Sequence, residues 1–216
     1  AREESCPHVV LPQGLAPRNA IGHLFAGLNV LTAPSLEDRR PEAARHLRSV
    51  REHVASNRSP VPEIAEHLEA AALPVLLAGD ANTLCAARRW RASLAENAKV
   101  PATVWELPEA AHNRLVAAGR DGPRRGALGL LALGIPADAH ARRRWDAVLA
   151  ALEAHGAKPL RVTLPHRVPW IEALGLAYLG DWMSLDLAGR LGVDPEPLAL
   201  MTDVKSRFRK GKDTAS

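Results

Sequence analysis

The sequence predicts an α/β fold in which a doubly wound parallel sheet is flanked by helices. Two observations predict it. Short apolar runs alternate with helical segments of ten or more residues, which is the pattern of right-handed strand–helix–strand crossovers. The chain also has 216 residues, of which 47% are hydrophobic and 24% are charged, enough to bury the core that a sheet covered on both faces requires.

The individual elements follow from hydrophobic periodicity. Pro17 suits the first turn of the first helix, because the fixed φ of proline is compatible with that position. Taken in chain order, the expected elements are a strand at 8–11, helices at 17–31, 41–55 and 62–73, strand–helix pairs at 75–78 with 83–98, 103–107 with 109–118, 127–133 with 137–155 and 160–164 with 170–191, and a last helix at 195–208.

The carboxyl ends of the strands form the candidate binding rim, because ligands of doubly wound sheets bind there. The loops that leave those ends are expected at 79–82, 108–113 and 134–138. His112 falls on this rim.

Charge and composition limit the function classes. The net charge of +4 permits attraction to anions such as sugar phosphates or nucleic acid. The basic tail at 205–212 has neither a stacking platform nor a recognition-helix motif, so we expect no nucleic-acid partner. The apolar runs are far too short to span a bilayer and the N-terminus has no apolar signal core. We therefore expect a cytoplasmic protein without a membrane partner.

Cysteine and histidine usage predicts neither a disulfide framework nor a metal centre. Cys6 and Cys85 have no second Cys or His at metal-ligand spacing, and we expect both to be buried as small apolar residues. The nine histidines are scattered along the chain. We expect no metal.

One pair of residues is the candidate for proton-transfer chemistry. Glu96 and His112 lie sixteen residues apart, each beside an amide side chain, on segments that we expect to meet across a sheet edge. A carboxylate and an imidazole suit acid/base work near neutral pH. Two ordinary roles stay open on these residues alone. Glu96 could pair with Lys99 at an exposed helix end, and His112 could be a helix N-terminal residue beside a capping Asn113.

Several motifs together resemble one known family. They are Gly14-Leu15-Ala16-Pro17-Arg18, Glu96-Asn97-Ala98-Lys99, the sequence Leu-Pro-Glu-Ala-Ala-His-Asn at 107–113, Gly180-Asp181-Trp182-Met183-Ser184, Gly192-Val193-Asp194-Pro195 and Lys205. In this order they resemble the second half of the bifunctional phosphoglucose/phosphomannose isomerases, which belong to the sugar isomerase (SIS) fold group. The similarity covers nearly the whole chain and implies a flavodoxin-like three-layer sandwich.

The resemblance implies an enzyme, an aldose–ketose isomerase that interconverts glucose 6-phosphate and/or mannose 6-phosphate with fructose 6-phosphate through an enediolate. It implies Glu96 as the base between C2 and C1. His112 would open the sugar ring and would come from the neighbouring subunit of a homodimer. Arg18 would stabilise the charge of the enediolate, and Lys205 would assist ring opening. The substrate is then a hexose 6-phosphate, and no cofactor is implied.

The sequence departs from the family pattern at the phosphate anchor. The family holds phosphate with a Ser/Thr-rich loop of its N-terminal SIS domain, and no Ser-Gly-x-Thr-x-Glu segment is present here. We therefore expect residues 1–18 to be the last strand and exit of a truncated N-terminal SIS domain, 19–62 a helical linker, and 63–216 the C-terminal SIS domain with its C-terminal helix and basic tail. On that basis this chain alone could be inactive. The alternative is a non-catalytic SIS module that binds a sugar phosphate and regulates a partner.

Overall fold

The computed structural model describes residues 6, 8–15, 18, 20–32, 38–118, 127–197 and 199–213. The chain divides into two compact units, Ala1–Ser49 and Val50–Ser216, each with its own internal packing. The second unit carries the sheet and most of the candidate site residues.

The first unit contains helix α1 (Ile21–Thr32) and most of helix α2 (Arg40–Val54). The strand expected at 8–11 is not formed, because these residues have irregular backbone. An extended segment is stabilised by hydrogen bonds to a neighbouring strand, and the described residues of this unit contain no strand that could pair with it. Leu11 instead packs near Gly27 of α1, where an added Cβ would approach its side chain to 3.2 Å.

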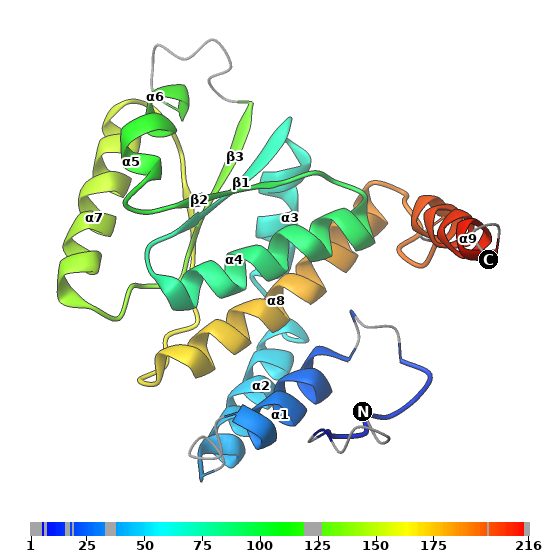
Figure 1. Cartoon of the computed structure of the whole chain (residues 1–216). Coiled ribbons are helices and arrows are strands. Elements are labelled where there is room, and N and C mark those ends of the chain that lie inside the picture. Colours follow the sequence, from blue (N-terminus) through cyan, green and yellow to red (C-terminus); the bar gives the residue numbers. More distant parts are fainter. Residues whose placement is uncertain are drawn as a thin grey trace. The chain divides into compact units, whose positions relative to one another are not determined.

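A four-stranded parallel sheet forms the centre of the second unit (Figure 1). Its strands, in spatial order, are β2 (Thr103–Glu106), β1 (Leu73–Ala78), β3 (Leu128–Leu133) and β4 (Leu160–Val162). Ala78, at the end of β1, is in register with Glu106 on one side and with Leu133 on the other. The chain leaves β1 toward one edge and β3 toward the other, so the boundary between these two strands is the topological switch point.

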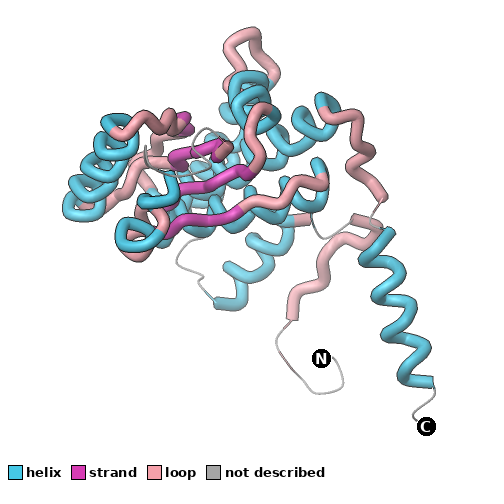
Figure 2. The backbone as a smooth tube through the Cα atoms, turned by 90° about the horizontal axis from the view of Figure 1, so that it is seen from above, coloured by secondary structure: helices cyan, strands magenta, loops and turns pink. Residues whose placement is uncertain are grey.

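Helices cover both faces of the sheet, and Figure 2 shows the four strands edge to edge between them. The helices of one face are α3 (Val61–Glu69), α4 (Ala81–Ser93) and α8 (Pro169–Arg190), and they pack with Leu76, Ala78, Leu131 and Leu133. The helices of the opposite face are α5 (Ala110–Asn113), α6 (Leu115–Ala118) and α7 (Ala139–Ala154), and they pack with Val75, Leu77, Leu130 and Ala132. Successive strand residues thus enter opposite cores. The predicted doubly wound sheet is confirmed.

Several helices differ from their expected bounds. The helix expected at 62–73 ends at Glu69, and Leu73 already begins β1, while the helix expected at 17–31 is observed over Ile21–Thr32. The helix expected at 109–118 is two short helices, α5 and α6, interrupted at Arg114. The last helix, α9 (Ala199–Asp213), begins later than expected, because Pro197 disfavours helical backbone at the residue before it. The helix expected at 83–98 changes to a π-helical turn over Leu94–Ala98.

Other sequence expectations concern membranes, metals and thiols. Within the described ranges, no helix is long and apolar enough to cross a membrane. Those same residues contain no group of three or more His, Cys, Asp or Glu side chains placed to hold a metal.

Cys6 and Cys85 are exposed free thiols, so the prediction that both are buried is wrong. On α4 the neighbours Leu84 and Ala86 face the core, and the helical period turns Cys85 outward.

Candidate active site

Glu96 lies on a helical turn of unusual geometry. Helix α4 ends at Ser93 and continues as a π-helical turn over Leu94–Ala98. The backbone N–H groups of Lys99 and Val100 both bond back to the carbonyl oxygen of Leu94. Such turns are rare and are often found at functional sites. This one holds Glu96 half-buried in a segment that packs against α8.

Lys99 closes the turn. Its φ of 58° is left-handed, a conformation that a residue with a side chain adopts mainly where the surroundings fix it. Its Nζ donates to the carbonyl oxygens of Glu96 at 2.5 Å and Pro195 at 3.2 Å. Through these two hydrogen bonds the Lys99 side chain links the end of the turn to the segment before α9, and we refer to this link as the Lys99 clamp.

Asn97, the residue after the candidate base, joins the turn to α8. It is buried, and its Nδ2 donates to the Oγ of Ser184 at 2.9 Å. Ser184 is itself fully buried and donates to the carbonyl oxygen of Asp181 at 2.9 Å. A buried hydrogen bond between side chains fixes both partners, because breaking it leaves two polar groups without solvent. The orientation of the turn against α8 is thus set immediately beside Glu96.

Asp181 brings a second carboxylate close to Glu96. Its Oδ1 accepts from the Oγ of Ser93 at 2.7 Å and from Arg89, whose Nη2 lies at 2.7 Å and Nε at 3.0 Å. Burial raises the pKa of Asp181, the Ser93 hydroxyl and Arg89 oppose this, and the charge of Glu96 raises the pKa further. The charge of Glu96 therefore acts on Asp181 where the π-helical turn packs against α8.

Sequence reasoning did not assign a role to Asp181 or Ser184. The available signal was their spacing of three residues on one helix, which places them on the same face as neighbours.

The contact between Trp90 and Gly180 fixes the distance between α4 and α8. The buried indole Nε1 donates to the carbonyl oxygen of Leu176 at 2.6 Å. A Cβ added at Gly180 would overlap the ring of Trp90. The glycine is needed because it lets the aromatic ring lie directly on the helix backbone.

His112 lies at the opposite end of β2 from Glu96. The turn that carries Glu96 precedes the amino end of β2, and His112 is on α5, which follows the carboxyl end. The expectation that the two segments meet across one sheet edge is therefore wrong within one chain, because a parallel strand separates them. The His112 side chain is exposed. Its neighbour Asn113 donates to the Oε1 of Glu109 at 3.0 Å.

The remaining candidates are Arg18 and Lys205. Arg18 belongs to the first unit, where it is partly buried and has an interaction partner. Lys205 lies on α9, whose side chains are exposed from 199 to 208. The cluster around Glu96 is therefore made by α4, the π-helical turn and α8.

The binding rim is present at the carboxyl ends of the strands, but its central position is filled by a side chain. Asp80 is the N-cap of α4, and its Oδ1 accepts from the backbone N–H of Thr83 at 2.8 Å. Its Oδ2 accepts from the N–H of Ala137, in the loop after β3, at 3.0 Å. A helix N-terminus at a switch point is a typical anion site. Here the anion is the protein's own carboxylate, which sequence reasoning missed.

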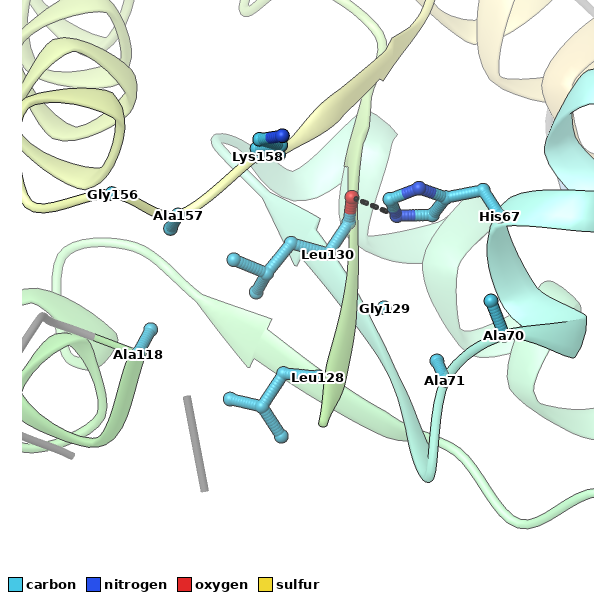
Figure 3. Close-up of a pocket in the computed structure, with 10 residues that line it drawn as sticks. All are labelled: His67, Ala70, Ala71, Ala118, Leu128, Gly129, Leu130, Gly156, Ala157 and Lys158. Atoms are coloured by element: carbon cyan, nitrogen blue, oxygen red, sulfur yellow. Dashed lines mark hydrogen bonds between the residues drawn. The ribbon is translucent and has the colours of Figure 1, made fainter. Parts of the chain in front are cut away.

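A cavity of about 490 Å³ lies at the amino edge of the sheet, away from Glu96 (Figure 3). Most of its wall is small or apolar, including Ala71, Leu128 and Leu130. The Nε2 of His67 lies 3.2 Å from the carbonyl oxygen of Leu130, to which it donates. Among the described residues this cavity contains none of the candidate site residues.

Sequence comparisons with known proteins match phosphoglucose isomerase sequences. A family model described as the bacterial phospho-glucose isomerase C-terminal SIS domain matches residues 57–208. A bifunctional phosphoglucose/phosphomannose isomerase of Aquifex aeolicus (strain VF5) is 27% identical over 210 residues, covering 97% of this chain and 64% of the relative. One of Caldicellulosiruptor bescii is 26% identical over 230 residues, covering 99% and 66%. The chain spans about two thirds of the length of these curated relatives.

Two solved structures share the architecture. A glucose-6-phosphate isomerase like protein from Thermus thermophilus superposes with a TM-score of 0.68 at 16% identity, covering 91% of this chain and 66% of that chain. The C-terminal domain of a glucosamine-fructose-6-phosphate aminotransferase from Francisella tularensis gives 0.59 at 12% identity, covering 82% and 51%. At these identities the likeness establishes the fold.

Proposed function

Since this chain belongs to the family of bacterial phospho-glucose isomerase C-terminal SIS domains, we propose that it supplies the base of a sugar-phosphate isomerase. The reaction is the interconversion of glucose 6-phosphate and/or mannose 6-phosphate with fructose 6-phosphate. The observation that carries the proposal is the position of Glu96, half-buried on a π-helical turn that buried hydrogen bonds hold against α8. A base needs a fixed carboxylate at the edge of a polar pocket.

Glu96 acts on the open-chain sugar. Its carboxylate takes the proton from C2 of the aldose, which leaves a negative enediolate, and returns it to C1, while the proton of the O2 hydroxyl moves to O1, which gives the ketose. A carboxylate can take and return one proton over the short distance between adjacent carbons. The Lys99 clamp and the Asn97–Ser184 bond keep the carboxylate in one place during both transfers.

His112 acts from a second copy of the chain. Within one chain it lies across β2 from Glu96, and its exposed imidazole is accessible to a partner subunit. In a homodimer the histidine moves a proton between the ring oxygen and the C1 hydroxyl, which opens the pyranose. A complete site then contains Glu96 of one subunit and His112 of the other.

Two cations complete the proposed site. Arg18 places a permanent positive charge beside the enediolate oxygens, where such charge stabilises the transition state. Lys205, whose exposed ammonium group lies on α9, assists ring opening.

The proposed domain boundaries follow the same resemblance. Residues 1–18 are proposed as the exit of an N-terminal SIS domain, 19–62 as a helical linker and 63–216 as the C-terminal SIS domain.

The phosphate of the substrate is bound by protein outside this chain. The chain spans about two thirds of its curated relatives, and Asp80 occupies the α4 N-terminus at the switch point. This position therefore does not accept a second anion. The alternative function, a non-catalytic SIS module that binds a sugar phosphate and regulates a partner, would therefore need a binding position other than this helix N-terminus.

A coupled assay tests the proposal. Production of glucose 6-phosphate and mannose 6-phosphate from fructose 6-phosphate is measured on the chain alone and on a fusion with the part of the A. aeolicus relative that it does not cover. We expect turnover in the fusion, its loss in the fusion with Glu96→Gln, and its retention with Glu106→Gln, an exposed carboxylate at the end of β2. Equal turnover in both variants would exclude Glu96 as the base.

A further inference from the structure

We propose that the second unit binds a small hydroxylated anion in a cavity at the carboxyl edge of the sheet, separate from Glu96. The cavity has a volume of about 450 Å³. It lies where the loops after β3 and β4 meet the start of α8, and it is lined by Ile135, Arg142, His166, Arg167, Pro169 and Glu172 among others. Glu172 and Asp181 are nine residues apart on α8, about 14 Å along a helix. The inference does not depend on the proposed isomerase activity.

Glu172 presents a buried polar atom that no described residue satisfies. The residue is only 9% exposed, and its Oε1 has no hydrogen-bond partner within the described structure. Gly134 lies beside this oxygen: its φ is +68°, and a Cβ there would lie 3.4 Å from Oε1, in ordinary van der Waals contact. A buried oxygen without a partner costs about 1–3 kcal/mol. Native proteins rarely leave one without a water molecule or a ligand.

The raised pKa of Glu172 favours a hydroxyl group as its hydrogen-bond partner. Burial raises its pKa, and the carboxylate of Asp80 acts in the same direction, whereas the backbone N–H of Ile135 and the charge of Arg142 lower it. A carboxyl group that holds its proton more readily can accept a hydrogen bond from one hydroxyl and donate to another. Such a group suits a polyol better than a second anion.

Cationic side chains line another part of the cavity. The Nε and Nη2 of Arg142 donate to the carbonyl oxygen of Pro136 at 3.2 and 3.1 Å, which fixes the guanidinium. Arg167 adds a second guanidinium. The Nδ1 of His166 accepts from the backbone N–H of Val168 at 3.1 Å, so a neutral ring carries its proton on Nε2. Guanidinium groups favour phosphate and carboxylate.

The N-terminus of α8 reinforces this positive character. The helix has 22 residues and begins at Pro169, and its N-cap Val168 provides no side-chain hydrogen bond. The first backbone N–H groups of a helix carry partial positive charge. At α4 a carboxylate fills the corresponding position, whereas α8 opens onto the cavity. An anionic group near Pro169 and a hydroxyl group near Glu172 together fit the cavity lining.

Isothermal titration calorimetry of the whole chain with sn-glycerol 3-phosphate tests the inference. Inorganic phosphate, glycerol and glycerate are the comparison probes, since they separate the phosphate, the hydroxyl and the carboxylate. We expect binding of the glycerol phosphate, weaker binding of inorganic phosphate, and none of glycerol. Affinity is expected to fall about tenfold in Glu172→Leu, which removes the buried carboxyl oxygens, and in Arg142→Gln, which removes an exposed guanidinium that lines the cavity.

Matched variants localise the site. Arg143→Gln removes an exposed arginine next to Arg142 that does not line the cavity, and Glu96→Gln changes a side chain of the π-helical turn that does not line it either. Both are expected to bind as the unaltered chain does. Glu172→Leu is expected to raise the melting temperature without ligand, because it removes the buried unpaired oxygen, and this also shows that the variant is folded. The inference fails if the unaltered chain does not bind, or if Glu172→Leu binds equally well.

Discussion

Glu96 and His112 flank strand β2 from opposite ends: the π-helical turn with Glu96 leads into the strand, and α5 with His112 follows it. A strand of four residues separates them, about 13 Å of extended backbone. We therefore do not expect Glu96 and His112 of one chain to act on the same substrate, since groups that exchange protons with one substrate must lie within hydrogen-bond reach of it.

Complementation between two inactive variants tests whether the pair is completed across subunits. Glu96→Gln and His112→Ala are each expected to inactivate the full-length fusion. Mixing them under conditions of subunit exchange is expected to restore roughly a quarter of the activity, because half of the dimers are mixed and each mixed dimer has one intact site. Activity that stays absent after verified exchange would contradict the cross-subunit arrangement.

The Asn97–Ser184 hydrogen bond is expected to hold the catalytic turn. Asn97→Ala leaves the buried Ser184 hydroxyl without its donor, so we expect a loss of about 1–3 kcal/mol in the free energy of unfolding and a fall in kcat. The double variant with Ser184→Ala measures the coupling between the two residues. Additive losses would mean that the bond does not form in solution.

Asp181 is expected to make stability depend on pH. Its pKa is raised above its ordinary 3.8, mainly by burial, so the folded state binds a proton that the unfolded state releases. The free energy of unfolding therefore decreases as the pH rises from 3.8 through the raised value. Asp181→Asn removes this dependence. Urea titrations across that range compare the two slopes, and equal slopes would refute the assignment.

Two glycines of α8 should respond oppositely to alanine. A Cβ at Gly180 overlaps the Trp90 ring, whereas one at Gly189 meets nothing within 4 Å. Gly180→Ala is expected to destabilise the protein by about 1–3 kcal/mol through overpacking. Gly189→Ala is expected to stabilise it by up to about 1 kcal/mol through helix propensity. Thermal unfolding of both variants is the measurement, and two effects of the same sign would contradict the packing described.

Asp80 is expected to stabilise the fold through its two backbone hydrogen bonds. Asp80→Ala removes the partners of Thr83 and Ala137 and should lower the free energy of unfolding by about 1–2 kcal/mol. Asp80→Asn keeps an N-cap side chain and serves as the control, with a loss expected to be smaller. If both variants unfold alike, the carboxylate charge rather than the cap is the stabilising feature.

Local patterns predicted the architecture because they reflect burial directly. The apolar runs at 75–78 and 127–133 lie in strands that are buried on both faces, and the helical segments between them follow from their period. The same reasoning failed at 8–11, where the pattern was suitable for a strand but the described residues of that unit contain no neighbouring strand. Whether a strand forms depends on a partner that local sequence does not reveal.

The candidate site was predictable in part for a similar reason. Glu96 and His112 were identified by motif, but their relation depends on the direction of β2, which becomes clear only once α4 and the strand are placed. Asp80 and Glu172 gave no motif signal. Their roles come from interactions with Ala137 and Ile135, respectively, more than thirty residues away in sequence.

The π-helical turn at Leu94–Ala98 makes the direction of the Glu96 carboxylate depend on the number of residues in the turn. One residue more or fewer in a helix rotates everything beyond it by about 100°. Deleting Ala95 would leave every proposed catalytic residue present, yet an α-helical turn in place of the π-helical one would turn the Glu96 carboxylate away from Asp181. A relative could therefore keep the full motif and lose the activity through a single-residue deletion in this turn.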